Sequence, residues 1–298
     1  MLSFYKNELS VINSQILSAS PSEVPVLLQR IPLGLLGSIE SGSGRDLYPE
    51  LSKYLPTMAS DAIQMSWTGQ SGNELLKQSV DFMNSVVHFY ETTPRNESTT
   101  ARIYDANVLD FGCGWGRLAR LLLKHVPENQ IYAVDPWSES LRHCKEHNVR
   151  ANFGLSEYLC RELPFGSIKF DLVYAYSVFT HLSRKAGQLA LRTIHSRMNP
   201  NGVFAITVWD DSCWDILANI HENLPINKLK NDYQKEGFAF LPHNNREAIE
   251  GEVTYGDASI SLDHIEKQWS DWDIVGTDVS LLVPSQLVVF LRPKYRYT

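Results

Sequence analysis

The sequence predicts an α/β fold with a doubly wound, mostly parallel sheet. From residue 106 onward, short apolar runs that suit buried strands alternate with amphipathic runs that suit helices. The first of these strands runs into a turn with Gly112, Gly114 and Gly116, and leucines at helical spacing follow. A strand, a glycine turn and a helix in this order bring backbone N–H groups and a helix N-terminus up to a ligand.

The alternation continues to the end of the chain. We expect strands at 106–111, 130–135, 150–154, 170–174, 202–209, 272–279 and 286–291, and helices at 115–125, 137–147 and 183–197. Ser183 is a favoured N-cap for the last helix, and Pro200, Asn201 and Gly202 mark a turn before the strand that begins there. The last two strands, joined by residues 280–285, are expected to be adjacent.

The first 100 residues have a different character. Prolines and the Ser-Gly repeat at 41–44 interrupt them, and helices are expected at 5–17, 46–54 and 73–90. The polar stretch 91–100 is expected to be a linker. We therefore divide the chain into a helical N-terminal extension, 1–100, and a sheet domain, 101–298.

Composition narrows the class of protein. Hydrophobic residues make up 43% and charged residues 20% of the 298 residues, as in an ordinary globular protein. No apolar run reaches the roughly 18–20 residues of a membrane span, and the N-terminus lacks the layout of a signal peptide. The four cysteines are widely spaced, which favours a reducing cytoplasm over a zinc site or a disulfide framework. A net charge of −7 without a basic tract counts against a nucleic acid partner.

The glycine spacing identifies the kind of ligand. It is not the G-x-G-x-x-G dinucleotide fingerprint, because the third glycine comes one residue early, and no Gly-Lys-Ser/Thr follows as in a P-loop. The next strand ends in Asp135, nineteen residues after Gly116 (135 − 116 = 19). A carboxylate at this position can hold the two hydroxyls of a ribose.

The segments VLDFGCGWGRLAR (108–120) and YAVDPWSESL (132–141) resemble the first two motifs of class I S-adenosylmethionine (SAM)-dependent methyltransferases. The resemblance covers about 105–210 well. It implies a Rossmann-like seven-stranded sheet with an antiparallel terminal strand, and SAM as cofactor. Residues 170–183 and 255–269 look like a group that often modifies sugars or sugar-bearing metabolites. Residues 54–76 resemble the N-terminal helical caps of the same group, which implies a lid whose mobile part includes Trp67.

The resemblance also implies cofactor contacts. The residues it places against SAM are Asp110, Gly112, Cys113, Gly114, Arg117, Asp135, Pro136, Trp137, Ser156 and Tyr176. Asp110 would lie near the ammonium group, with a turn cap as the alternative, and Trp137 would lie against adenine, with core packing as the alternative. Arg117 would reach the carboxylate or else be an exposed helix residue. Ser156 departs from the acidic residue that many members carry near adenine.

The acceptor side follows from the chemistry. The sulfonium is an activated leaving group, so methyl transfer needs alignment and exclusion of water but no metal. A hydroxyl acceptor needs a base for its proton, and His181, after the fourth strand of the sheet, is the first candidate. His264, His243 and Tyr255 are weaker candidates. Asp210 and Asp211 follow the fifth strand and are either substrate ligands or solvated loop acids. The aromatic faces of their neighbours Trp209 and Trp214 could bind a sugar ring.

We therefore expect a SAM-dependent methyltransferase whose partner is a small-molecule acceptor, most simply a hydroxyl of a sugar or glycosylated metabolite. Neither nucleic acid nor membrane is expected as a partner, and a homodimer is left open. The alternatives are a nicotinamide-dependent oxidoreductase, which the absence of a Tyr-x-x-x-Lys pair disfavours, and a non-catalytic partner protein with a methyltransferase fold. A nucleic acid methyltransferase is disfavoured because the Asn/Asp-Pro-Pro-Tyr/Phe motif is missing after the fourth strand.

Overall fold

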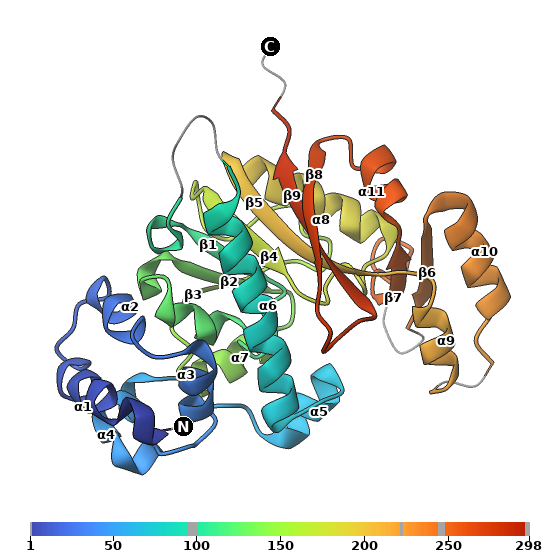
Figure 1. The fold of residues 1–298 in the computed structure, drawn as a ribbon. Helices are drawn as coiled ribbons and strands as arrows, with labels where there is room; N and C mark the ends of the chain where they lie inside the picture. Colours follow the sequence, from blue (N-terminus) through green and yellow to red (C-terminus); the bar gives the residue numbers. More distant parts are fainter. Residues whose placement is uncertain (1, 95–100, 221–222, 244–247, 296–298) are drawn as a thin grey trace. The chain divides into compact units, whose positions relative to one another are not determined.

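The computed structural model describes residues 2–94, 101–220, 223–243 and 248–295 (Figure 1). The chain forms two compact units, residues 1–155 and 156–298. The functional boundary expected at 100/101 stays a prediction.

Three parallel strands lie in the first unit. They are β1 (Val108–Phe111), β2 (Ile131–Asp135) and β3 (Asn152–Leu155). β2 lies between the other two, with Asp110 opposite Ala133 and Asp135 opposite Leu155. Helix α7 (Ser138–Glu146) follows β2. All four elements were predicted, although β1 begins two residues later than expected.

The prediction of an α-helix at 115–125 is wrong. The glycine turn continues to Leu118, and the 3₁₀ segment η4 (Ala119–Lys124) takes the place of an α-helix. All five residues from 119 to 123 are buried. The segment therefore packs on every side rather than on one amphipathic face.

Helices dominate the N-terminal part of the first unit. They are α1 (Lys6–Gln15), α2 (Glu23–Leu28), α3 (Leu33–Glu40), α4 (Pro49–Tyr54), α5 (Asp61–Thr68) and α6 (Gly72–Thr92). Short 3₁₀ turns lie at Leu2–Tyr5, Arg45–Leu47, Ile103–Asp105 and Glu128–Gln130. The three predicted helices correspond to α1, α4 and α6. The prediction missed α2, α3 and α5, which have eight residues or fewer and so carry too few turns to show a clear periodicity.

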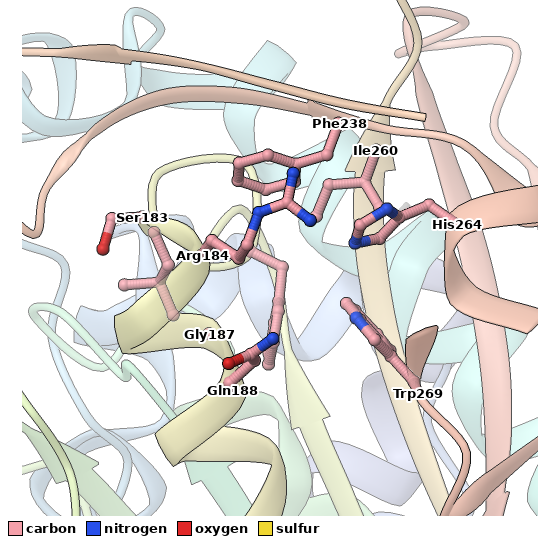
Figure 2. A pocket seen from close by; sticks show the side chains of 10 residues that line it. Ser183, Arg184, Gly187, Gln188, Phe238, Ile260, His264 and Trp269 are labelled. Atoms are coloured by element: carbon pink, nitrogen blue, oxygen red, sulfur yellow. The ribbon is translucent and has the colours of Figure 1, made fainter. Parts of the chain in front are cut away.

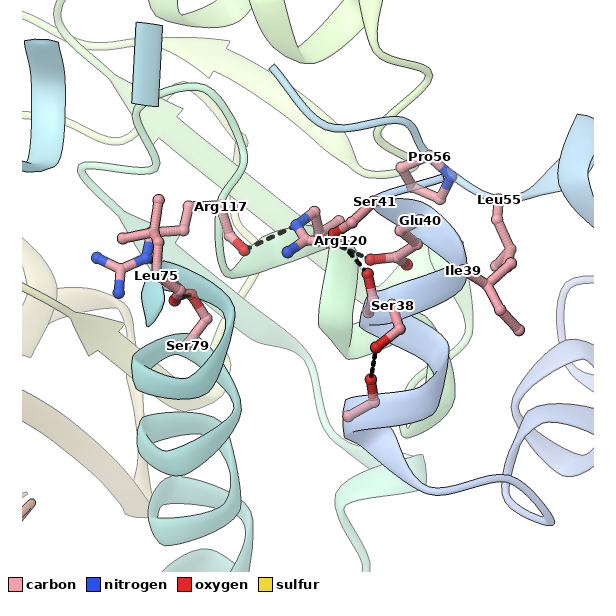
Figure 3. Close-up of polar contacts among 12 residues, drawn as sticks. Ser38, Ile39, Glu40, Ser41, Leu55, Pro56, Leu75, Ser79, Arg117 and Arg120 are labelled. Atoms are coloured by element: carbon pink, nitrogen blue, oxygen red, sulfur yellow. Dashed lines mark hydrogen bonds and ion pairs between the residues drawn. The ribbon is translucent and has the colours of Figure 1, made fainter. Parts of the chain in front are cut away.

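Two basic side chains of η4 bind these helices. The Nζ of Lys124 donates to the carbonyl oxygens of Leu28, Gln29 and Ile31 at the end of α2. Arg120 forms a fully buried ion pair with Glu40 of α3 (Figure 3). The segment that follows the glycine turn is thus joined to the N-terminal helices through polar contacts as well as apolar packing.

The second unit contains β4 (Phe170–Ala175), α8 (Arg184–Arg197), β5 (Met198–Trp209), β8 (Trp272–Val279) and β9 (Gln286–Pro293). Ser183 caps α8, as predicted, because its Oγ accepts from the N–H of Ala186. β4 and β5 are parallel, whereas β9 is antiparallel to both β5 and β8. The sheet order is β3-β2-β1-β4-β5-β9-β8, which confirms the predicted seven-stranded, mostly parallel sheet with an antiparallel strand near the chain end.

An insertion after β5 was not anticipated. It consists of α9 (Cys213–Ala218), α10 (Ile226–Glu236), β6 (Phe238–Pro242), β7 (Gly256–Ile260) and α11 (Leu262–Gln268). β6 and β7 pair as an antiparallel two-stranded sheet of their own. Within the described ranges, no helix is both long and apolar enough to cross a membrane.

Candidate active site

The glycine turn and the end of β2 are linked through Asp135. Gly112, Gly114 and Gly116 all have positive φ angles, of 79°, 53° and 82°, a conformation that glycine adopts without a steric cost. Gly114 N donates to Asp135 Oδ2 and Trp137 N donates to Asp135 Oδ1, both at 2.9 Å. One carboxylate therefore holds the turn after β1 against the turn after β2. These are carboxyl ends of parallel strands, where α/β sheets bind ligands.

The same carboxylate has capacity to spare. Asp135 is only 8% exposed. Burial raises its pKa above the ordinary value, although hydrogen bonds from the backbone of Trp137 and Gly114 and from the side chain of Ser140 act in the opposite direction. A carboxylate accepts about four hydrogen bonds, so the two backbone donors and Ser140 leave room for one further donor, such as a ribose hydroxyl.

Several other expected cofactor residues lie in this unit. Asp110 is buried in β1, at 2% exposure. Cys113, buried in the turn, lies in one apolar cluster with Cys144 of α7, and its burial beside that thiol raises the pKa of Cys113 well above the ordinary value. Trp137 is 41% exposed, so it is not the core residue that was the alternative. Its contact with adenine stays a prediction, as does the expected contact of Pro136.

Arg117 is not the exposed helix residue that was its alternative. It is 8% exposed, and its guanidinium donates from Nε to Ser79 Oγ at 2.8 Å and from Nη2 to Gln78 Oε1 at 3.0 Å. Figure 3 shows Arg117 beside Ser79 and Leu75 of α6. The expected contact with the carboxylate of SAM stays a prediction.

Ser156 and Tyr176 belong to the second unit. Ser156 directly follows β3 and Tyr176 directly follows β4, and both are half-buried. Their positions along the chain are those the resemblance implied, but their contacts with the cofactor stay predictions.

The second unit brings two ionisable side chains, Asp257 and His243, close to His181. The Nδ1 of His181 lies 2.8 Å from the carbonyl oxygen of Gly256 and 3.3 Å from Asp257 Oδ1. The other oxygen of Asp257 lies 3.0 Å from His243 Nε2. A bridge between Leu182 and Tyr255 places the start of β7 beside the segment after β4, so the insertion supplies both partners of His181.

This arrangement fixes the tautomer of His181. A carbonyl oxygen only accepts, so Nδ1 carries the proton and Nε2 keeps its lone pair to act as a base. Burial raises the pKa of Asp257, but the hydrogen bonds from His181 and His243 outweigh it, so the pKa is lowered overall and the group is anionic. Tyr255 stacks on the His181 ring at 5.3 Å, and Trp209 contacts it edge-on at 5.4 Å.

The other two expected catalytic residues are held elsewhere in the same unit. His264 is 4% exposed, its Nδ1 lies 2.7 Å from the carbonyl oxygen of Glu236, and burial lowers its pKa. Figure 2 shows it lining a pocket with Arg184, Phe238 and Trp269. Asp210 is exposed and accepts from the N–H of Ser212 at 2.9 Å, within the turn that precedes α9. Their catalytic roles stay predictions, and the contacts described for His181 include neither residue.

The expectation that Trp214 offers a face to a sugar is wrong. The side chain is fully buried and its Nε1 donates to Ser259 Oγ at 3.0 Å. It packs in a small core with Cys213, Leu229 and Ala239, which the insertion after β5 creates. Trp209 is half-buried and remains beside His181.

Sequence reasoning missed Asp257 altogether. The only local signal was an acid in the stretch 255-YGDASI-260 that had already been noted for its resemblance. Its contact with His181 depends on the packing of β7 beside residues 180–182, which has no short-range signature. Among the described residues, we find no group of three or more His, Cys, Asp or Glu side chains placed to hold a metal ion.

The glycine turn after β1 and the sheet order are those of a Rossmann-like α/β fold. Residues 108–202 match the family described as methyltransferase domain. This stretch of the chain is therefore similar to a methyltransferase domain.

The individual relatives have low sequence identity to the chain. The chain is 28% identical over 124 residues to the malonyl-[acyl-carrier protein] O-methyltransferase of Halalkalibacterium halodurans, covering 40% of this chain and 44% of the relative. It is 24% identical over 191 residues to the 2-methyl-6-phytyl-1,4-hydroquinone methyltransferase of a Synechocystis species, covering 60% and 58%. The chain thus spans about half the length of these relatives. The PH0226 protein of Pyrococcus horikoshii shares the fold, with a TM-score of 0.52, 16% identity, and coverage of 73% of this chain and 91% of that one.

Proposed function

We propose that this protein is a SAM-dependent methyltransferase that acts on a small-molecule acceptor. The observation that carries the proposal is the Gly114–Asp135–Trp137 link at the ends of β1 and β2, within a stretch that matches the methyltransferase domain. Asp135 would hold the ribose, and Trp137 and Pro136 would lie toward adenine. The turn from Gly112 to Gly116, with Asp110, would face the methionine part.

When bound, the cofactor supplies a methyl group on a positively charged sulfur. The chain's own task is to align the acceptor and to remove a proton. His181 would take that proton on Nε2, because its Nδ1 is held by the carbonyl of Gly256. Asp257 would stabilise the imidazolium that results, as a carboxylate behind a histidine does in other enzymes.

The surroundings of His181 favour a hydroxyl acceptor. A hydroxyl loses a proton as its new C–O bond forms, whereas an unprotonated amine attacks without a base. The rings of Trp209 and Tyr255 beside His181 suit the flat apolar face of a sugar or an aromatic ring, so we propose a hydroxyl of a sugar or glycosylated metabolite as the acceptor.

The test uses the purified full chain with SAM labelled in its methyl group and a panel of glycosides, phenols and carboxylic acids. We expect label in a glycoside, located by mass spectrometry. His181→Gln lowers kcat by roughly 10²- to 10⁴-fold and leaves S-adenosylhomocysteine affinity unchanged. His88→Gln, an exposed change on α6, is the control. Labelling confined to phenols or acids would refute the proposed sugar acceptor. Full activity of His181→Gln would refute the proposed role of His181 as the base.

A further inference from the structure

Helix α5 brings a tryptophan to the cofactor side of the first unit. The Trp67 ring stacks on Trp137, with centroids 4.7 Å apart and planes inclined by 30°. A Cβ added to Gly114 would lie 3.9 Å from Trp67 Cε3, so the same indole also borders the glycine turn. Trp67 lies outside the matched stretch 108–202.

The position of Trp67 is fixed by its own helix. α5 is capped at its start by Ser60, which accepts from Ile63 N, and at its end by Gly69 in the left-handed conformation. The buried Gln64 joins α5 to α6, because its amide donates to Ala59 O at 2.6 Å and accepts from Gly72 N at 3.0 Å. On its inner side Trp67 packs against a cluster of Ala59, Leu75 and Trp115. The indole is therefore preorganised in its place beside Gly114.

Both indole rings are partly exposed and can therefore contact a ligand. Trp137 is 41% exposed and Trp67 is half-buried, so the pair presents an aromatic surface rather than a closed core. Trp137 N is bonded to Asp135, the carboxylate proposed to hold the ribose. The ribose of a nucleoside carries a flat base, and bases stack on aromatic side chains.

We propose that Trp67 and Trp137 together form the wall against which the purine ring of the cofactor stacks, so that the N-terminal segment supplies a cofactor-binding residue. This inference rests on the proposed function, because it assumes a nucleoside cofactor. It assigns to α5 a binding role in place of a merely covering one.

The test is calorimetric titration of the full chain with S-adenosylhomocysteine and, separately, with adenosine. Trp67→Leu keeps the apolar packing against Leu75 but removes the ring. We expect it to weaken both ligands by the same factor, about fivefold or more. Trp67→Phe, which restores a ring, recovers most of the affinity. Met65→Ala, on the 51% exposed side chain of the same helix, stays within about twofold of the parent. Thermal melts of each variant establish that it is folded.

The outcomes separate the two proposals. If the parent chain binds neither ligand, the proposed function fails. If the parent binds and folded Trp67→Leu binds equally well, the wall is refuted and the function stands. Tighter binding by Trp67→Leu would mean that the indole obstructs the site, and weakening confined to S-adenosylhomocysteine would mean that it acts at the amino acid end. Either result overturns the inference.

Discussion

Alanine substitutions at two glycines of the same turn should separate folding from ligand binding. Gly116 has φ +82°, and an added Cβ would lie 2.9 Å and 3.1 Å from the two methyls of Val149 and 3.2 Å from Cys144 Sγ. The left-handed backbone costs roughly 1–2 kcal/mol for alanine, and overpacking costs typically about 1–3 kcal/mol more. Gly116→Ala should therefore lower the free energy of unfolding by roughly 2–5 kcal/mol.

Gly114 differs in its surroundings. Its φ is +53°, and the nearest atom to an added Cβ is Trp67 Cε3, at 3.9 Å. Only the backbone cost of roughly 1–2 kcal/mol applies to Gly114→Ala. The new methyl would nevertheless project beside Trp67, where we propose that the cofactor lies, so we expect a folded protein that binds S-adenosylhomocysteine at least about tenfold more weakly.

Urea unfolding and calorimetric titration of both variants measure these two effects. Gly34→Ala is the control, because Gly34 lies in α3 with nothing within 4 Å of an added Cβ, and it should stabilise by roughly 0.5–1 kcal/mol. The reasoning is refuted if Gly114→Ala is the less stable of the two turn variants, or if it binds S-adenosylhomocysteine like the parent.

Three further predictions concern side chains. Arg117→Met removes the hydrogen bonds to Ser79 and Gln78 and should lower the free energy of unfolding by roughly 1–3 kcal/mol. A loss of affinity for S-adenosylhomocysteine but not for adenosine would support a contact between Arg117 and the cofactor carboxylate. Equal affinities of variant and parent for S-adenosylhomocysteine would refute that contact. The pKa of Asp257 is lower in the folded chain than its ordinary value of 3.8. Its stabilising contribution is therefore present above that value and lost as the pH falls through the folded-state pKa, so urea unfolding of Asp257→Asn should show a smaller loss of stability on acidification than the parent, and identical pH profiles would contradict this. Cys113, buried and with a raised pKa, should resist iodoacetamide at neutral pH in the folded chain, and rapid alkylation detected by mass spectrometry would show that its turn opens.

The sheet could be predicted from the sequence because each of its strands is a local apolar run. β2 and β4 follow such runs closely, and Asp135 was found because the acid stands where a predicted strand ends. The N-cap of α8 at Ser183 was likewise a local signal.

What could not be predicted depends on contacts between distant residues. Residues 119–124 have leucines at helical spacing, yet they form a 3₁₀ segment whose first five residues are buried against other parts of the chain. In the sequence, Trp214 resembles an exposed ligand-binding residue, but in the structure it is buried within the insertion after β5. Asp257 gains its partners only when β7 packs beside residues 180–182, and no spacing in the sequence announces that contact.

The most direct test of the central claim is calorimetric titration of the parent chain and Asp135→Asn with S-adenosylhomocysteine, NAD and NADP. We predict that the parent binds S-adenosylhomocysteine and neither nicotinamide cofactor. Hydrogen bonds to a charged group contribute roughly 1.5–3 kcal/mol each, so loss of one charged ribose contact should weaken binding to Asp135→Asn by about tenfold or more. Binding of NAD or NADP instead, or equal affinity of the two proteins for S-adenosylhomocysteine, would contradict the account.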